Sequence, residues 1–537
     1  MRGWSRPDVV ICLAVLAVAA AVRLPHLQTI PILTDETEDM RLGMEITRGD
    51  RPLMSQDAYN GPVFHYVMAA GYAMAAAVFV DGGDPRWPRR LALALGSLTV
   101  VLTYLVGISV AAAARAGPGP PGPAPGARPA IAWRDRAAGL IAAAIMAVAF
   151  VPVVVNSHVA WSNASSPFWA MLAVLAVCEA HRRGDPRWLV PAGALSGLAC
   201  QTHASVLPVA LGAALFVVWV RPGWLRTPWP WLGLAAGVAA IANVIVFNLQ
   251  TGGASIVAGQ GKHYAYAFGA PWPEYVVNVR DCLRMAYQLA TSTFLGLDPE
   301  EGRPELLALL RSPAAVAYGT LVAAALVATA RRSRLPLLTW VLVILVVSAF
   351  NRGYRYYLHA RYLAAGLPLL YVAVGLWLAG WVPAPGRPGR WPRAAALAAA
   401  LVLLVGYPLV RLEGFYARET ALDRTGARLW QVIDGLAQRV GPDGQVRLDR
   451  GLHGIPTAGG GNVHKALDEV MDVTGTPHRK PKPEDLLDHH PGAYLVLTEA
   501  GHAALAERMV LEPVDFGVPL APYGRGRFDV YRAVGER

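Results

Sequence analysis

The sequence predicts a polytopic α-helical membrane protein with a small α/β domain at its C-terminal end. Of its 537 residues, 54% are hydrophobic and 16% are charged, whereas soluble domains carry about 25% charged residues. Apolar runs rich in Ala, Val and Leu recur up to about residue 412, and a helix of about 20 such residues crosses a bilayer. The net charge is +11, but the arginines gather in short loops between these runs, so we expect no nucleic-acid partner.

The apolar runs define the expected spans. They lie at residues 9–29, 62–80, 89–113, 137–155, 165–180, 188–202, 204–220, 230–250, 313–330, 336–350, 358–380 and 394–412. Because residues 188–220 can form two short helices or one kinked element, we expect about 11–13 transmembrane helices. Arg2 and Arg6 precede the first run and no small-residue cleavage site follows it, so it is expected to be an uncleaved span.

Charge in the loops predicts the orientation. Five loops are basic, with arginines in the stretches 115–136, 182–187, 221–226, 331–334 and 387–393. The positive-inside rule places these loops in the cytoplasm, and loop 24–61, loop 251–312 and the C-terminal part outside a plasma membrane. One conflict follows, because two simple crossings at 62–80 and 89–113 would leave the basic stretch 114–136 outside. One of these two segments is therefore expected not to cross simply.

The C-terminal part has a different pattern. We expect helix 418–440, strand 445–449, helix 464–472, strand 493–498, helix 499–508 and strand 526–533. Residues 1–412, with a Pro/Gly-rich linker in 114–136, are therefore predicted to form the membrane domain. Residues 413–537 are predicted to form an extracytoplasmic α/β domain that stabilises the protein or binds the acceptor.

The first outer loop carries four carboxylates within five positions. They are Asp35, Glu36, Glu38 and Asp39. A carboxylate at a membrane–water boundary suits a general base that takes a proton from an acceptor hydroxyl. The alternative is a solvated helix start, because acidic side chains are favourable at helix N-termini.

Further polar residues fall on the same expected side. His65 follows a Gly-Pro pair one turn into an apolar run, where it can move a proton, donate to phosphate or simply pack. The stretch 351–362 breaks the positive-inside pattern, and arginine either matches phosphate oxygens there or snorkels. Its candidate residues are Arg352, Tyr354, Arg355, Arg361 and Tyr362. The remaining candidates, each of which can equally be an ordinary buried polar residue, are His158, Asn163 and His203.

Taken in chain order, these motifs resemble the GT-C glycosyltransferase superfamily. They are Asp35-Glu36, Gly61-Pro62-Val-Phe-His-Tyr, Arg89-Arg90-Leu-Ala-Leu, Asn156-Ser-His with Asn163, and Arg361-Tyr-Leu-Ala-Ala-Gly-Leu-Pro368. The nearest branch looks like the protein O-mannosyltransferase and lipid A aminoarabinose transferase group. The resemblance covers about residues 1–410.

The resemblance implies an inverting transferase that moves a sugar from a polyprenyl-phosphate carrier to an extracytoplasmic glycan, lipid or protein hydroxyl. It implies a catalytic role for Asp35, with Glu36 as its neighbour, and no cofactor beyond the lipid-linked donor. The candidates around the donor phosphate are His65, His203, Arg352, Arg355 and Arg361. We expect no metal, because the sequence has neither a CxxC nor an HExxH motif.

This chain also departs from the family pattern. Asn60-Gly61, Asn163 and His203-Ala204 stand where relatives often have Lys, Asp and Lys-Gly, which predicts a different donor or an inactive relative. Two other functions stay open: a flippase or transporter of lipid-linked sugars, and a non-catalytic cell-envelope assembly protein. A transporter should carry its polar residues near mid-membrane, whereas those of this sequence gather towards one face.

Overall fold

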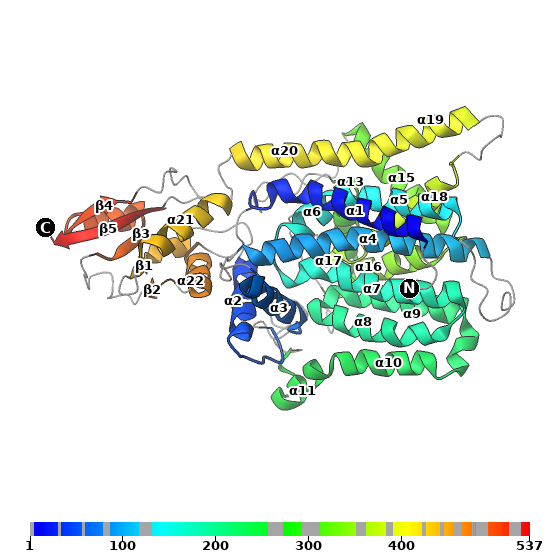
Figure 1. Ribbon diagram of the computed structural model, residues 1–537, viewed down its shortest axis with the longest axis horizontal. Helices are drawn as coiled ribbons and strands as arrows, with labels where there is room; N and C mark the ends of the chain where they lie inside the picture. The colour runs from blue at the N-terminus through cyan, green and yellow to red at the C-terminus, as the bar shows by residue number, and fades with distance from the viewer. Residues whose placement is uncertain are drawn as a thin grey trace.

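The structure is a computed structural model with a bundle of apolar helices and an α/β domain beyond one end of it (Figure 1). It describes residues 5–30, 34–55, 60–78, 86–116, 131–255, 272–292, 312–350, 361–382, 390–421, 426–440, 445–454, 463–474, 476, 478–479, 492–514 and 528–536. The predicted fold class, a helical membrane protein with a small C-terminal α/β part, is confirmed.

The bundle has one continuous apolar core. Its helices are α1 (Arg6–Arg23), α4 (Trp87–Ala116), α5 (Trp133–Val148), α6 (Phe150–Ser157), α7 (Ser162–Arg183), α8 (Leu189–Thr202), α9 (Leu207–Val220), α10 (Trp229–Ala240), α11 (Ala242–Thr251), α13 (Trp272–Thr291), α15 (Pro313–Thr329), α16 (Leu335–Phe350), α17 (Arg361–Ala364), α18 (Leu367–Ala379), α19 (Arg390–Leu401) and α20 (Tyr407–Ala421). Within the described residues, three helices are long and apolar enough to span a membrane, or up to five if each bent pair counts as one span. The number of 11–13 crossings stays a prediction.

One of the bent pairs shapes the end of the bundle where polar residues gather. Helices α5 and α6 meet at an angle of 59° at Ala149, whose backbone is extended. Pro152 explains the break, because proline has no N–H to continue the α5 ladder and its ring excludes a carbonyl one turn earlier. The bend leads the chain through α6 into the segment before α7.

Close packing of α8 on α10 depends on two small-residue motifs. Gly193 and Gly197 of α8 face Gly233 and Gly237 of α10, each pair in GxxxG spacing. A Cβ on Gly193 would lie 1.8 Å from the Gly233 carbonyl oxygen, so no side chain fits there. Small residues are enriched where membrane helices approach closely, since apolar burial alone does not favour association within lipid.

Helix α3 (Val63–Val78) resolves the conflict in the predicted crossings. It lies with α2 (Thr34–Thr47) at the end of the bundle nearer the α/β domain (Figure 1), and the middle of α3 packs against the beginning of α4 near Trp87. Helix α3 therefore does not cross from end to end, whereas α4 runs the length of the bundle. The described ends of the basic stretch, with Arg115 in α4 and Arg136 in α5, then lie at the same end as the start of α1, where Arg136 binds Asp8, as the charge predicts.

The C-terminal domain is a mixed sheet with helices packed on it. Its elements are α21 (Gly426–Arg439), β1 (Val446–Leu448), α22 (Val463–Thr474), β2 (His478–Arg479), β3 (Tyr494–Thr498), α23 (Glu499–Ala506), β4 (Met509–Pro513) and β5 (Phe528–Glu536). The strand order is β2-β1-β3-β5-β4, in which β1 is parallel to β2 and β3, and β5 is antiparallel to β3 and β4. Helix α20 continues to Ala421, nine residues beyond the expected boundary at residue 412.

A buried ion pair fastens α2 to the bundle. The Glu36 carboxylate accepts two hydrogen bonds of 2.7 Å from the Arg89 guanidinium at the start of α4, and both side chains are at most 1% exposed. Arg89 also donates to the Leu27 and Ile30 carbonyl oxygens, and Glu36 accepts the Ala160 N–H at 3.0 Å. The pair therefore joins four segments of the chain at one point.

We expect Arg89→Ala to destabilise the fold strongly. Removal of one partner leaves a buried, uncompensated carboxylate, which costs about 3–5 kcal/mol. The measurement is the melting temperature of the detergent-solubilised protein, with Arg90→Ala as the control because Arg90 is the exposed neighbour on the same helix. Equal melting temperatures of the two variants would contradict the anchoring role of the pair.

Candidate active site

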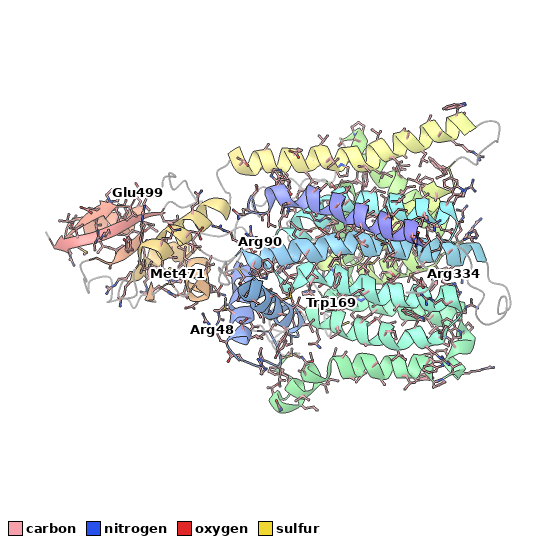
Figure 2. The ribbon with its side chains drawn as sticks, viewed as in Figure 1. Arg48, Arg90, Trp169, Arg334, Met471 and Glu499 are labelled. Atoms are coloured by element: carbon pink, nitrogen blue, oxygen red, sulfur yellow. The ribbon has the colours of Figure 1, made fainter. Side chains whose placement is uncertain are left out.

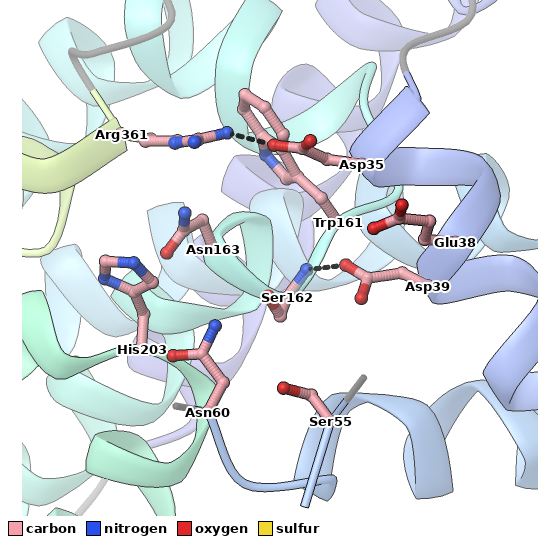
Figure 3. Close-up of a pocket in the computed structure, with 10 residues that line it drawn as sticks. All are labelled: Asp35, Glu38, Asp39, Ser55, Asn60, Trp161, Ser162, Asn163, His203 and Arg361. Atoms are coloured by element: carbon pink, nitrogen blue, oxygen red, sulfur yellow. Dashed lines mark hydrogen bonds and ion pairs between the residues drawn. The ribbon is translucent and has the colours of Figure 1, made fainter. Parts of the chain in front are cut away.

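A polar cavity lies where α2 meets the bundle (Figure 3). Its volume is about 40 Å³, room for a few water molecules, since one needs about 10–15 Å³. The residues that line it come from separate parts of the chain: Asp35, Glu38, Asp39, Ser55, Asn60, Trp161, Ser162, Asn163, His203 and Arg361. The cavity thus combines an acidic helix face with amide, imidazole and guanidinium groups.

One face of α2 supplies the carboxylates. Asp35, Glu38 and Asp39 are spaced i, i+3 and i+4, which places them on the same side of a helix. The expected outer loop 24–61 is therefore helical over Thr34–Thr47. Glu36 points elsewhere, because one residue along a helix turns by about 100°, and the structure places it in the buried pair with Arg89. Glu36 does not line the cavity.

Asp35 and Arg361 face each other across the cavity. Arg361 Nη1 donates to Asp35 Oδ2 at 2.7 Å (Figure 3), and the Asp35 side chain is 48% exposed. The guanidinium stacks over the Trp161 ring at 4.7 Å, a cation–π contact that orients it. Its Nε–H is buried with no hydrogen-bond partner among the described residues. Arg361 therefore has an unused donor beside an accessible carboxylate.

Asp39 is held more firmly than Asp35. The Ser162 N–H donates to Asp39 Oδ2 at 2.7 Å, and His65 Nε2 lies 2.6 Å from Oδ1, with the imidazole as donor. His65 is 1% exposed and lies behind Asp39, so it reaches the cavity only through that carboxylate. Its Nδ1 is buried with no partner among the described residues. The two contacts fix the Asp39 carboxylate in one orientation.

The wall opposite α2 offers unused acceptors. Asn60 Oδ1 and Asn163 Oδ1 are buried and have no hydrogen-bond partner among the described residues. Buried polar atoms are normally paired, so two such atoms beside one cavity suit a polar ligand such as a sugar. His203 accepts the Ser205 N–H through Nδ1 at 3.1 Å, and its ring lies 5.4 Å from that of Tyr362.

The structure places the sequence-predicted residues in different surroundings. Asp35, Asn163, His203 and Arg361 line the cavity, while His65 and Tyr362 support its walls. His158 lies elsewhere: its Nε2–H donates to the Arg23 carbonyl oxygen at 2.7 Å, and Nδ1 accepts the Tyr416 hydroxyl at 3.1 Å. Three further candidate residues from the sequence lie outside the described residues: Arg352, Tyr354 and Arg355.

Several lining residues were not selected from the sequence. Glu38 and Asp39 stand in the acidic cluster, and their i+3 and i+4 spacing from Asp35 would have indicated a shared helix face. Trp161 and Ser162 lie between Asn156-Ser-His and Asn163, but no sequence signal shows that the break before α7 turns them towards α2. Ser55 carried no signal at all.

The C-terminal domain supports α2 from the side away from the bundle. Lys465 of α22 pairs with Glu38, and the Thr37 hydroxyl donates to Glu469. Met40 of α2 is fully buried in the apolar core of the domain. Burial disfavours the charged form and raises the pKa of the Glu469 carboxyl to about 6, although Thr37 and Lys465 oppose that shift. Helix α2 thus lies between the bundle and the domain.

Comparison with known proteins agrees with this architecture. Residues 132–247 match the family model described as dolichyl-phosphate-mannose-protein mannosyltransferase. ArnT from Cupriavidus metallidurans superposes with a TM-score of 0.52 in the apo state and 0.51 when bound to undecaprenyl phosphate, at 15% and 14% identity. The apo comparison covers 97% of both chains. The chain has the GT-C fold. The resemblance predicted from the sequence is thereby confirmed.

A more distant likeness is to the Archaeoglobus fulgidus oligosaccharyltransferase in the apo form. Its TM-score is 0.46 at 14% identity, over 91% of this chain and 69% of that one. No curated protein sequence matches the chain. At their identities the two ArnT comparisons establish the fold alone, and the chemistry of the cavity has to be argued from its own residues.

We expect Glu469→Gln to stabilise the protein more at pH 7.5 than at pH 4.5. A carboxyl whose pKa is raised on folding contributes stability below its ordinary pKa and loses that contribution as the pH rises through about 6. Glutamine carries no charge at either pH and keeps the polar contact with Thr37. The measurement is the melting-temperature difference between variant and native protein at both pH values.

The control for this experiment is Glu499→Gln, because Glu499 is an exposed acid of the same domain. Its difference from the native protein should change less with pH than that of Glu469→Gln. If the Glu469→Gln difference were also the same at both pH values, the carboxylate would not be buried against α2 in the way described.

Proposed function

We propose that the chain is an inverting membrane glycosyltransferase. It moves a sugar from a polyprenyl-phosphate carrier to a glycan, lipid or protein hydroxyl on the extracytoplasmic side of the plasma membrane. The observation that carries the proposal is the Asp35–Arg361 pair, a reachable carboxylate and a guanidinium facing one polar cavity at one end of an apolar bundle. ArnT, which has the same fold, has been crystallised with bound undecaprenyl phosphate.

Arg361 is the proposed partner of the donor phosphate. Its planar guanidinium matches phosphate oxygens through two donors, and stacking on Trp161 holds that plane in place. A phosphate that takes the Nη1 donor of Arg361 competes with Asp35, because Asp35 accepts its hydrogen bond from that nitrogen. Donor binding would therefore release Asp35 at the moment when an acceptor needs a base.

The proposed reaction follows from these two groups. The acceptor oxygen forms a bond to the anomeric carbon, the bond from that carbon to the phosphate oxygen breaks, and its electron pair leaves on the phosphate. Asp35 takes the acceptor proton, and Arg361 stabilises the charge that develops on the phosphate. Attack opposite the leaving phosphate inverts the anomeric configuration. The lipid-linked donor is a substrate, and the reaction needs no separate cofactor or metal.

The other cavity residues have proposed roles in positioning. Asp39, fixed by His65 and the Ser162 N–H, can hold a hydroxyl of the sugar or acceptor. The unpaired oxygens of Asn60 and Asn163 can accept from sugar hydroxyls. These polar groups lie at one end of the bundle, which favours transfer at a membrane surface over transport through the bundle centre.

The test is sugar transfer by membranes that contain the full chain, supplied with a panel of radiolabelled polyprenyl-phosphate sugars. We expect label to move to a macromolecular acceptor with the native protein. Asp35→Asn should lower kcat by about 100-fold or more, because it removes the base. Arg361→Gln should raise the KM for the donor as well as lower kcat.

The control is Asp50→Asn, since Asp50 is an exposed acid just after α2 that does not line the cavity. It should transfer as the native chain does. Unchanged transfer by Asp35→Asn would exclude that carboxylate as the base. If no donor gave transfer in membranes that hold the host's acceptors, a transport or assembly role would replace the proposal.

A further inference from the structure

A second, larger cavity lies at the other end of the bundle. Figure 2 shows Arg334 at this end, away from Arg48 and Arg90, which lie near α2. The volume of this second cavity is about 480 Å³, whereas that of the candidate active site is about 40 Å³. It is enclosed by the ends of α4, α7 and α9 and by the α15–α16 connection, and its charged and polar side chains are Ser109, His181, Arg221, Arg331, Arg332, Ser333 and Arg334.

The lining is strongly cationic. Four arginines line the cavity, and no carboxylate among the residues that the structure describes belongs to its lining. The nearby Glu179 carboxylate is already used, because it accepts hydrogen bonds from Arg182, Arg183 and Ser109 at 2.6–2.8 Å. Its charge is thus matched outside the cavity. The cavity therefore concentrates positive charge that no carboxylate of the described residues pairs with.

Some of the cavity arginines are held by neighbouring side chains. The Arg221 Nε–H donates to His181 Nδ1 at 3.3 Å, so that imidazole nitrogen is an acceptor. The Arg334 guanidinium lies over the Trp219 ring at 4.4 Å, within the range of a cation–π contact. These contacts leave guanidinium N–H groups for another acceptor while restricting where the charges can go.

Ser333 supplies an independent sign of a ligand. It lies between Arg332 and Arg334 in the chain, lines the cavity and is only 7% exposed. Its hydroxyl has no hydrogen-bond partner among the described residues. A buried hydroxyl without a partner is costly, and a phosphate oxygen held by the adjacent arginines would accept its hydrogen bond.

The rest of the lining is apolar. Val110, Cys178, Phe216 and Val220 form part of the wall, and Trp219 at the rim is 57% exposed. A small hydrophilic anion would leave this apolar surface uncovered. An amphiphile would place its phosphate among the arginines and its glycerol and first methylenes against the apolar wall. Basic cavities between membrane helices commonly bind lipid headgroups for this reason.

We propose that this cavity binds the phosphate headgroup of an anionic phospholipid from the leaflet at that end of the bundle. The basic loops predict that leaflet to be the cytoplasmic one. An alternative is that the arginines serve only to orient the protein by the positive-inside rule, which needs positive charge alone. That alternative explains neither a cavity of this size nor the buried hydroxyl of Ser333, which has no partner among the described residues.

The test uses the purified full chain in a neutral detergent. Phosphatidylglycerol is titrated, phosphatidylcholine is the neutral control lipid, and bound lipid is counted by native mass spectrometry. We expect saturable binding of one phosphatidylglycerol that is at least tenfold tighter than that of phosphatidylcholine. Arg332→Gln together with Arg334→Gln should weaken it by at least tenfold. Arg226→Gln should change it by less than twofold, because Arg226 is exposed at the same end but outside the cavity.

Ser333→Ala provides a second variant that keeps the charge unchanged. It removes an unpaired buried hydroxyl, so the lipid-free protein should melt at the same or a higher temperature. The rise in melting temperature on addition of phosphatidylglycerol should nevertheless become smaller. A purely structural role of Ser333 would not reduce the lipid-dependent rise.

Inorganic phosphate distinguishes a lipid site from a site for free anions. It should displace phosphatidylglycerol only at concentrations far above those of the lipid. Displacement at equal concentrations would assign the cavity to free phosphate and overturn the lipid proposal. Equal binding by the double arginine variant and Arg226→Gln would show that the arginines attract lipid only as general surface charge, and would also overturn it.

Discussion

The placement of α2 depends on the buried pair between Glu36 and Arg89. Because Arg89 also binds the Leu27 and Ile30 carbonyl oxygens, the pair sets the rotation of a polar helix against the segment that follows α1 and the start of α4. A helix that turned by one residue would rotate by about 100° and move Asp35 away from the cavity. Such a rotation would also separate Glu36 from Arg89 and leave a buried charge unpaired, which is costly. The buried pair therefore keeps the rotation of α2 in which Asp35 faces Arg361.

The C-terminal domain completes this constraint. The contacts of α22 with Thr37 and Glu38, together with the burial of Met40, hold the outward side of α2. The bundle and the domain therefore position one acidic helix between them. Among the described residues, Asp39 is fixed by two contacts, whereas Asp35 pairs with one arginine that a phosphate can recruit, so the two carboxylates differ in freedom. That difference supports the assignment of proton transfer to Asp35 and of positioning to Asp39.

Much of the fold could be predicted from local pattern. The expected strands at 445–449 and 493–498 match Val446–Leu448 and Tyr494–Thr498, because buried strands have a composition of their own. The short strands β2 and β4 were missed. Helix α2 was expected only as a solvated helix start, as the alternative at the acidic cluster, and the structure gives it the bounds Thr34–Thr47. The burial of Glu36 could not be predicted from the sequence, because it depends on Arg89, 53 residues away.

Two of the site residues, Asp35 and Arg361, could be identified from the sequence because a carboxylate or an arginine beside an apolar run is unusual. His158 was also a candidate, but in the structure it binds the Arg23 carbonyl oxygen and lies outside the cavity.

The most direct test of this account is a cryo-EM map of the full chain in nanodiscs with a polyprenyl phosphate. We expect the phosphate within hydrogen-bond distance of the Arg361 guanidinium, about 3 Å, with the Asp35–Arg361 pair opened and the Glu36–Arg89 pair intact. Phosphate density away from Arg361, with the Asp35–Arg361 pair still closed, would contradict the account. It would show that the cavity beside α2 is not where the lipid-linked donor binds.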